Sequence, residues 1–228
     1  MNLTKCVFVA VIVTAGMWSR AALGQMDAED SKLNTNLALV LTAPLNPTAR
    51  FTDFGWGVVA GAGYNFNSHH AFVAEFMWNR LSVSDQALTP IRVALQSPDI
   101  NGHANLFALT ANYRLEFRGK RLGTYFIAGG GLYHRSTSIS QTVITGNTTV
   151  CTPEFLWWGA QCQSGIVTAD QTLASSSSSV FGGNAGVGFT VRLGEEPRYR
   201  FYLEARYHYA PHESVTTQLI PIAIGFRF

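Results

Sequence analysis

Hydrophobic and polar positions alternate along many short stretches of this chain. Between residues 55 and 66, "GWGVVAGAGYNF", the bulky side chains from Trp56 to Phe66 fall on even positions and the glycines on odd positions. A period of two places the two sets on opposite faces of a β-strand. We therefore expect β-structure, since no helical period is evident after the first 25 residues.

The same alternation recurs often enough to predict eight strands. An even number of antiparallel strands is typical of single-chain bacterial barrels in the outer membrane. The stretch from Thr124 to Arg135 leaves its facing open, because Tyr125 and Phe126 are both aromatic. The predicted strands span 34–42, the weakest candidate, and 55–66, 71–79, 105–115, 124–135, 181–193, 199–209 and 220–228.

The connections between these stretches alternate between long and short. Short turns at one end and long loops at the other are the periplasmic and extracellular sides of an outer-membrane barrel. The longest connection contains a serine run and two cysteines, and we expect an exposed, partly mobile surface loop there. The predicted extracellular loops are 43–54, 82–102, 136–179 and 211–217.

The beginning of the chain has the layout of a secretory signal. Lys5 precedes an apolar run over residues 6–17, and small residues follow at 22–24. The run is shorter than the roughly 20 residues of a spanning helix. We predict a signal peptide over residues 1–24 and one exported barrel domain over residues 25–228.

The export prediction bears on the cysteines. Removal of the signal leaves Cys151 and Cys162, and an even pair in an exported chain favours a disulfide. Closing so short a loop stabilises the fold by about 3 kcal/mol in the chain-entropy model. Metal ligation by the two thiols is the alternative.

The charged residues decide which way the apolar faces point. They make up 13% of the chain, and the net charge of +2 implies no nucleic-acid partner. The lumen of eight strands is too narrow for the many aromatic side chains. A charge facing lipid costs about 2 to 4 kcal/mol, and the bulky faces carry none. We expect these faces to contact lipid rather than the core of a soluble sandwich, with a charge network in the lumen formed by Glu75, Arg114, Arg192, Arg200, Glu204 and Arg206.

Several segments together resemble one known group of proteins. "FGGNAGVGF", "YLEARYHY" and the final "IPIAIGFRF" are similar to the small outer-membrane β-barrel superfamily of the OmpA and OmpX type, over Ser31 to Phe228. The resemblance implies an eight-stranded up-and-down transmembrane barrel in the cell outer membrane, surrounded by lipid and lipopolysaccharide. It also implies that Phe226 and Phe228 form the C-terminal signal read by the barrel-assembly machinery.

The functional expectation is a monomeric, non-enzymatic barrel with a structural or surface-contact role and no cofactor. Its lumen would be filled by side chains, with Glu75 meeting Arg114 and Glu204 meeting Arg206 or Arg192. A small pore for ions or solutes, lined by the same residues, is the alternative.

Two further constellations carry weaker chemical alternatives. His134 and Ser136 share a strand face, and with Glu154 they are similar to the serine hydrolase arrangement of lipid A deacylase barrels. Facing Tyr125 outward would turn His134 inward, away from lipid. The pairs His208 with His212 and His69 with His70 are interpreted as wetted strand ends rather than metal ligands.

Overall fold

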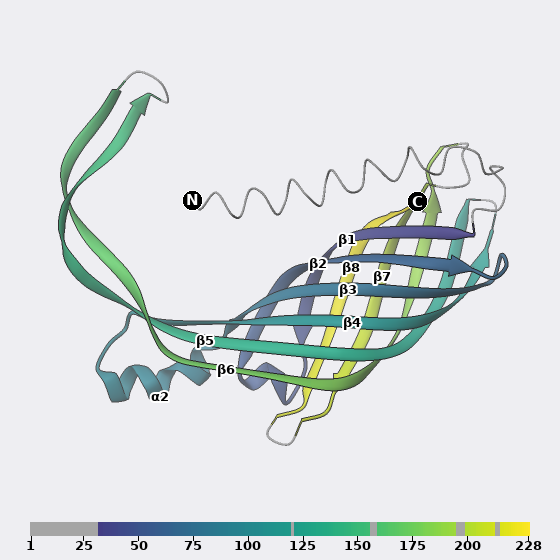
Figure 1. Ribbon diagram of the computed structural model, residues 1–228, viewed down its shortest axis with the longest axis horizontal. Helices are drawn as coiled ribbons and strands as arrows, with labels where there is room; N and C mark the ends of the chain where they lie inside the picture. The colour runs from purple at the N-terminus through teal and green to yellow at the C-terminus, as the bar shows by residue number, and fades with distance from the viewer. Residues whose placement is uncertain (1–31, 120, 156–158, 195–198, 213–214) are drawn as a thin grey trace.

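A computed structural model describes residues 32–119, 121–155, 159–194, 199–212 and 215–228. The predicted signal peptide lies outside these residues. Eight antiparallel strands form a closed barrel in which each strand pairs with its neighbours in the sequence (Figure 1). The predicted fold class is confirmed. The elements are β1 (Leu33–Pro44), η1 (Thr48–Arg50), β2 (Thr52–Asn65), β3 (His70–Val83), α2 (Asp85–Leu95), β4 (Ile100–Arg118), β5 (Leu122–Phe155), β6 (Gly159–Arg192), β7 (Arg200–Ala210) and β8 (Thr217–Arg227).

The last strand closes the barrel by pairing with the first. Phe226 lies opposite Leu37 in the β8–β1 ladder. The amide of Phe228 donates to the carbonyl of Thr35 at 2.8 Å, and the amide of Thr35 donates back at 3.1 Å. Closure leaves no strand edge in the barrel wall, as a hydrocarbon environment requires. Pro221 lies inside β8, where the β7–β8 pairs stop at Ala205↔Ile222 and resume at His208↔Leu219.

The two faces of the wall separate as the alternation predicts. Leu109 is 61% exposed on the outside, whereas its neighbour Thr110 is 5% exposed in the lumen. The open facing of β5 is now fixed, because Phe126 points outward and Tyr125 is buried. Tyr133 has the phase of Tyr125 and is likewise buried in the lumen.

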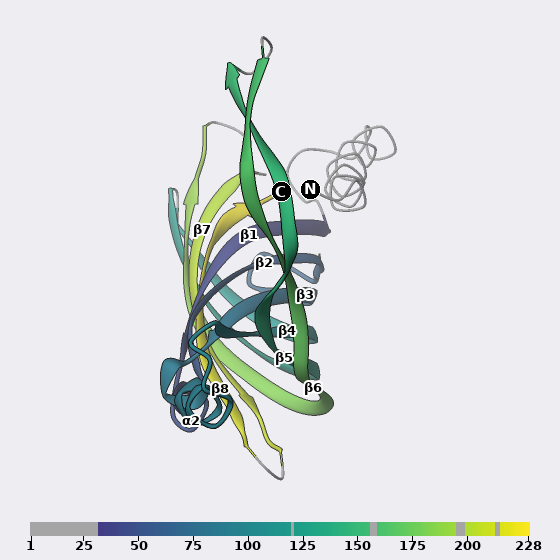
Figure 2. The same ribbon diagram turned by 90° about the vertical axis from the view of Figure 1, so that its left-hand side faces the viewer.

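The expected surface loop over residues 136–179 is wrong in its backbone conformation, because two paired strands form this connection. The β4 ladder ends at Ile100↔Gln141 and the β7 ladder begins at Gly183↔Tyr209, but β5 and β6 stay paired as far as Phe155↔Gly159. The two strands leave the barrel as a twisted β-ribbon (Figures 1 and 2). We call residues 142–155 and 159–170 the ribbon.

The connection 82–102 contains a helix that the sequence interpretation missed. Ser84 caps it by accepting from the amide of Ala87 at 3.3 Å, and its hydroxyl donates to the carbonyl of Arg50 at 2.9 Å. Pro90 lies inside the helix, and because proline is unfavourable in a helix interior, the sequence pattern did not indicate a helix here. In the described part of the chain, no helix is long and apolar enough to cross a membrane.

Candidate functional site: a filled lumen and an external ribbon

The centre of the lumen is held by an ion triad. The Arg206 guanidinium donates from Nη1 to Glu75 Oε2 and from Nε to Glu204 Oε1, each at 2.5 Å. The three side chains come from β3 and β7, which are not neighbours in the ring, and all are buried. The triad therefore joins opposite parts of the wall and occupies the space between them.

Neutral side chains satisfy the remaining carboxylate oxygens of the triad. Asn36 donates to Glu75 Oε1 at 2.8 Å, and Asn112 donates to Glu75 Oε2 at 2.9 Å. The Tyr125 hydroxyl donates to Glu204 Oε2 at 2.7 Å. Each carboxylate thus has partners from several strands, as a buried charge requires.

A second charged layer lies toward the end of the barrel with the short turns. Its centre is Glu116, which is 2% exposed. The Glu116 carboxylate faces four guanidinium groups. One of them, that of Arg227, also lies over the rings of Tyr125 and Tyr202, with its Cζ atom 4.8 and 5.4 Å from their centroids. The nitrogen-to-oxygen distances to Glu116 are 3.3 Å from Arg118, 3.3 Å from Arg227, 3.5 Å from Arg114 and 3.8 Å from Arg200.

The predicted lumen charges are therefore distributed over two layers. Glu204 meets Arg206, as expected, but Glu75 also meets Arg206, and Arg114 meets Glu116 instead of Glu75. Arg192 lies opposite Arg200 in the β6–β7 ladder. The sequence interpretation omitted Glu116 because it ended that strand at residue 115, and it omitted Arg227 although its position between Phe226 and Phe228 carries the inward phase.

An apolar layer lies above the triad, toward the end with the long connections. Its side chains are buried and form one cluster, and the Tyr133 hydroxyl is 2.9 Å from His208 Nδ1. A void of about 20 Å³ lies between residues of this layer and Glu75, Glu204 and Arg206. The side chains of the cluster on this side of the triad include Val40, Met77, Leu81, Leu106, Tyr133 and Leu219.

The hydrolase candidates do not come together. His134 and Ser136 lie on the outer face, because Tyr125 points inward, and His134 Nδ1 is 2.8 Å from the hydroxyl of Ser179. Glu154 is eighteen positions further along β5 than Ser136. At about 3.3 Å per residue its backbone lies tens of ångströms along the ribbon.

The histidine pairs also differ from the expectation in part. His208 is 4% exposed and lies in the lumen against Tyr133, so it is not a wetted strand end. His69 and His70 lie at the short turn between β2 and β3, and the ring of His70 bonds to the hydroxyl of Tyr113. Within the described ranges, no group of three or more His, Cys, Asp or Glu residues is placed to hold a metal ion.

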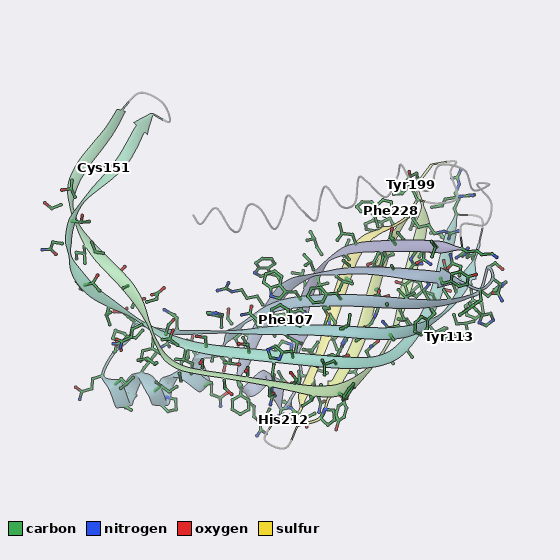
Figure 3. All side chains as sticks on the ribbon, viewed as in Figure 1. Phe107, Tyr113, Cys151, Tyr199, His212 and Phe228 are labelled. Atoms are coloured by element: carbon green, nitrogen blue, oxygen red, sulfur yellow. The ribbon has the colours of Figure 1, made fainter. Side chains whose placement is uncertain are left out.

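The ribbon extends far beyond the barrel wall. The backbone of Cys151 lies opposite that of Cys162, a register compatible with the predicted disulfide, which stays a prediction. Figure 3 places Cys151 near the outer part of the ribbon, whereas Tyr113, Tyr199 and Phe228 lie at the opposite end of the molecule. The ribbon and α2 leave from the same end of the barrel (Figure 1).

Comparison with known proteins gives the family. The model described as "Outer membrane protein beta-barrel domain" matches residues 52–228. The chain belongs to this family. As a family member it is an outer-membrane protein, which confirms the predicted location. No curated relative matches the sequence.

Solved structures of small outer-membrane barrels have a similar fold. Ail, the attachment invasion locus protein of Yersinia pestis, has 15% identity and a TM-score of 0.50 over 86% of this chain and 97% of its own. Neisserial surface protein A has 12% identity and a TM-score of 0.48 over 86% and 95%. The barrel domain of Pseudomonas aeruginosa OprF has 14% identity and a TM-score of 0.42 over 87% and 98%. At 15% identity, the similarity to Ail supports a shared fold alone.

Proposed function

We propose that this member of the outer-membrane barrel family is non-enzymatic and non-conducting, and that its filled barrel anchors the ribbon for contacts at the cell surface. The observation that carries the proposal is the continued pairing of β5 with β6 beyond the ends of the β4 and β7 ladders. A connection needed only to close the barrel would be a few residues long.

The chemistry of the ribbon supports a contact role. Its sequence holds two charged residues, Glu154 and Asp170, among many threonines and β-branched residues. Ile144 is 69% exposed and Ile166 is 60% exposed. The two outer edges of the ribbon extend past the ends of the β4 and β7 ladders. Exposed edges with few charges favour pairing with another strand or packing against another surface.

The lumen supports the non-conducting part of the proposal. The apolar layer, the ion triad and the layer around Glu116 follow one another along the barrel axis and draw side chains from opposite walls. Eight strands leave room for little more than side chains. The alternative of a small pore requires these bonded layers to separate.

A shortened protein tests the contact role without altering the barrel. Residues 142–170 are replaced by Asn-Gly, which favours a two-residue hairpin turn between the paired Gln141 and Gln171. The barrel should still fold and show heat-modifiable migration in gels, while cells expressing it lose aggregation in suspension and attachment to epithelial monolayers. Unchanged aggregation and attachment would contradict the proposal.

A further inference from the structure

A cavity opens at the mouth of the barrel, at the end from which the ribbon leaves. Its volume is about 330 Å³. It is lined by residues of the first and last long connections, by β5 and β6 just before they become the ribbon, and by leucines of the apolar layer. Its lining includes Phe51, Leu81, Leu106, Arg135, Ser178 and Thr217.

The floor of this mouth cavity is apolar and closed. Leu81, Leu106 and Leu219 are at most 3% exposed and belong to the buried cluster above the ion triad. Phe51 contributes an apolar wall from the first long connection. A bound molecule would therefore meet aliphatic and aromatic surface on entering, and its apolar part would be removed from water.

The rim of the cavity carries one arginine with neutral partners. Arg135 donates from Nε to the Ser178 hydroxyl at 2.9 Å, and from Nη1 to the Val215 carbonyl at 2.7 Å and the Thr217 hydroxyl at 3.3 Å. The ion pairs of the described residues do not include Arg135. Its charge is thus held in place by dipoles, in contrast to the carboxylate-paired arginines deeper in the lumen.

From this arrangement we infer that the mouth cavity binds a small amphipathic acid, with its carboxylate at Arg135 and its apolar body on the leucine floor. The volume lies at the lower end of the range of about 300 to 1,000 Å³ for ligand pockets. One aromatic ring with a short chain fills such a space. The anion would gain charge-assisted hydrogen bonds from the guanidinium and from the rim hydroxyls. This binding site is independent of the contact role proposed for the ribbon.

Titration of 4-phenylbutyrate into the protein in lipid nanodiscs, followed by ligand-observed NMR, tests the inference. The neutral analogue 4-phenylbutanol separates the contribution of the charge from that of the apolar body. Arg135→Gln should weaken phenylbutyrate binding at least tenfold and leave phenylbutanol binding within about twofold, while Arg135→Lys should retain most of the phenylbutyrate affinity.

Two neighbouring serines provide a matched pair of variants that avoids the buried floor. Ser176 lines the cavity, whereas Ser175 has the outward phase of the same strand. Ser176→Trp should abolish saturable binding, and Ser175→Trp should leave it unchanged; heat-modifiable migration confirms that each variant is folded. The inference is overturned if wild-type nanodiscs bind no more phenylbutyrate than empty ones, or if the two tryptophan variants behave alike.

Discussion

Removing Glu75 should destabilise the barrel more than any change at its surface. Its carboxylate accepts hydrogen bonds from Arg206 at 2.5 Å, from Asn36 at 2.8 Å and from Asn112 at 2.9 Å, and it is 4% exposed. In Glu75→Ala, one guanidinium loses half of its carboxylate partners and two buried amides lose an acceptor. Breaking a buried ion pair from one side costs about 3 to 5 kcal/mol, and we expect a loss in this range.

The measurement is denaturant unfolding of the protein in phospholipid vesicles, followed by tryptophan fluorescence. The matched control is Asp170→Ala, because that carboxylate is exposed on the ribbon; its effect should stay within about 0.5 kcal/mol. Combining Glu75→Ala with Glu204→Ala and Arg206→Met removes all three charges of the triad and should recover part of the loss. A loss below about 1 kcal/mol for Glu75→Ala alone would refute the idea that the triad holds opposite walls together.

Three other predictions follow from the packing, the cysteines and the filled lumen. A Cβ at Gly188 would overlap the ring of Tyr125, so Gly188→Ala should lower the free energy of unfolding by about 1 to 3 kcal/mol in the same assay. In the control Gly183→Ala, the new Cβ meets an ordinary contact at 3.6 Å, and the effect should be nearly neutral. Equal effects of the two substitutions would be inconsistent with this packing. Mass spectrometry after alkylation should find Cys151 and Cys162 blocked until a reductant is added, and free thiols before reduction would exclude the disulfide. Planar bilayers containing the purified protein should remain electrically silent, and steady single-channel currents would favour the pore.

The strands and their facing could be predicted because one physical contrast fixes both. A wall between lipid and a narrow lumen separates bulky apolar side chains from small and charged ones at every second residue. Leu109 and Thr110 follow this separation, and so does β8 up to its closing pair with β1. Where two consecutive residues are both aromatic, as at Tyr125 and Phe126, the pattern does not indicate which of them faces the lipid.

The ribbon was not predicted because its two faces do not meet the contrasting environments of lipid and lumen. Both faces of a ribbon beyond the membrane meet water, so the alternation between apolar and polar residues fades, and threonine is the commonest residue of the ribbon. The helix α2 was not predicted for a different reason. Ser84 and Asp85 provide a start signal, but Pro90 interrupts the pattern expected of a helix interior.

The spacing of residues in the sequence could predict only some of the ion-pair partners in the lumen. Residues two apart on one strand share a face, which brings Glu204 and Arg206 together and could be anticipated. The contact between Glu75 and Arg206 crosses the lumen between β3 and β7, and the inward phase alone does not specify which facing residues meet. Arg114 and Arg118 flank Glu116 two residues away on β4, whereas Arg200 and Arg227 reach it across the lumen from β7 and β8.

Nitroxide labels at Leu109 and Thr110 test most directly whether the bulky face contacts lipid while the lumen is filled. In liposomes, the label at Leu109 should collide often with dissolved oxygen and rarely with a water-soluble nickel chelate. The label at Thr110 should be shielded from both relaxing agents. Frequent collisions of the Thr110 label with the nickel chelate, or an aqueous environment at Leu109, would contradict the account.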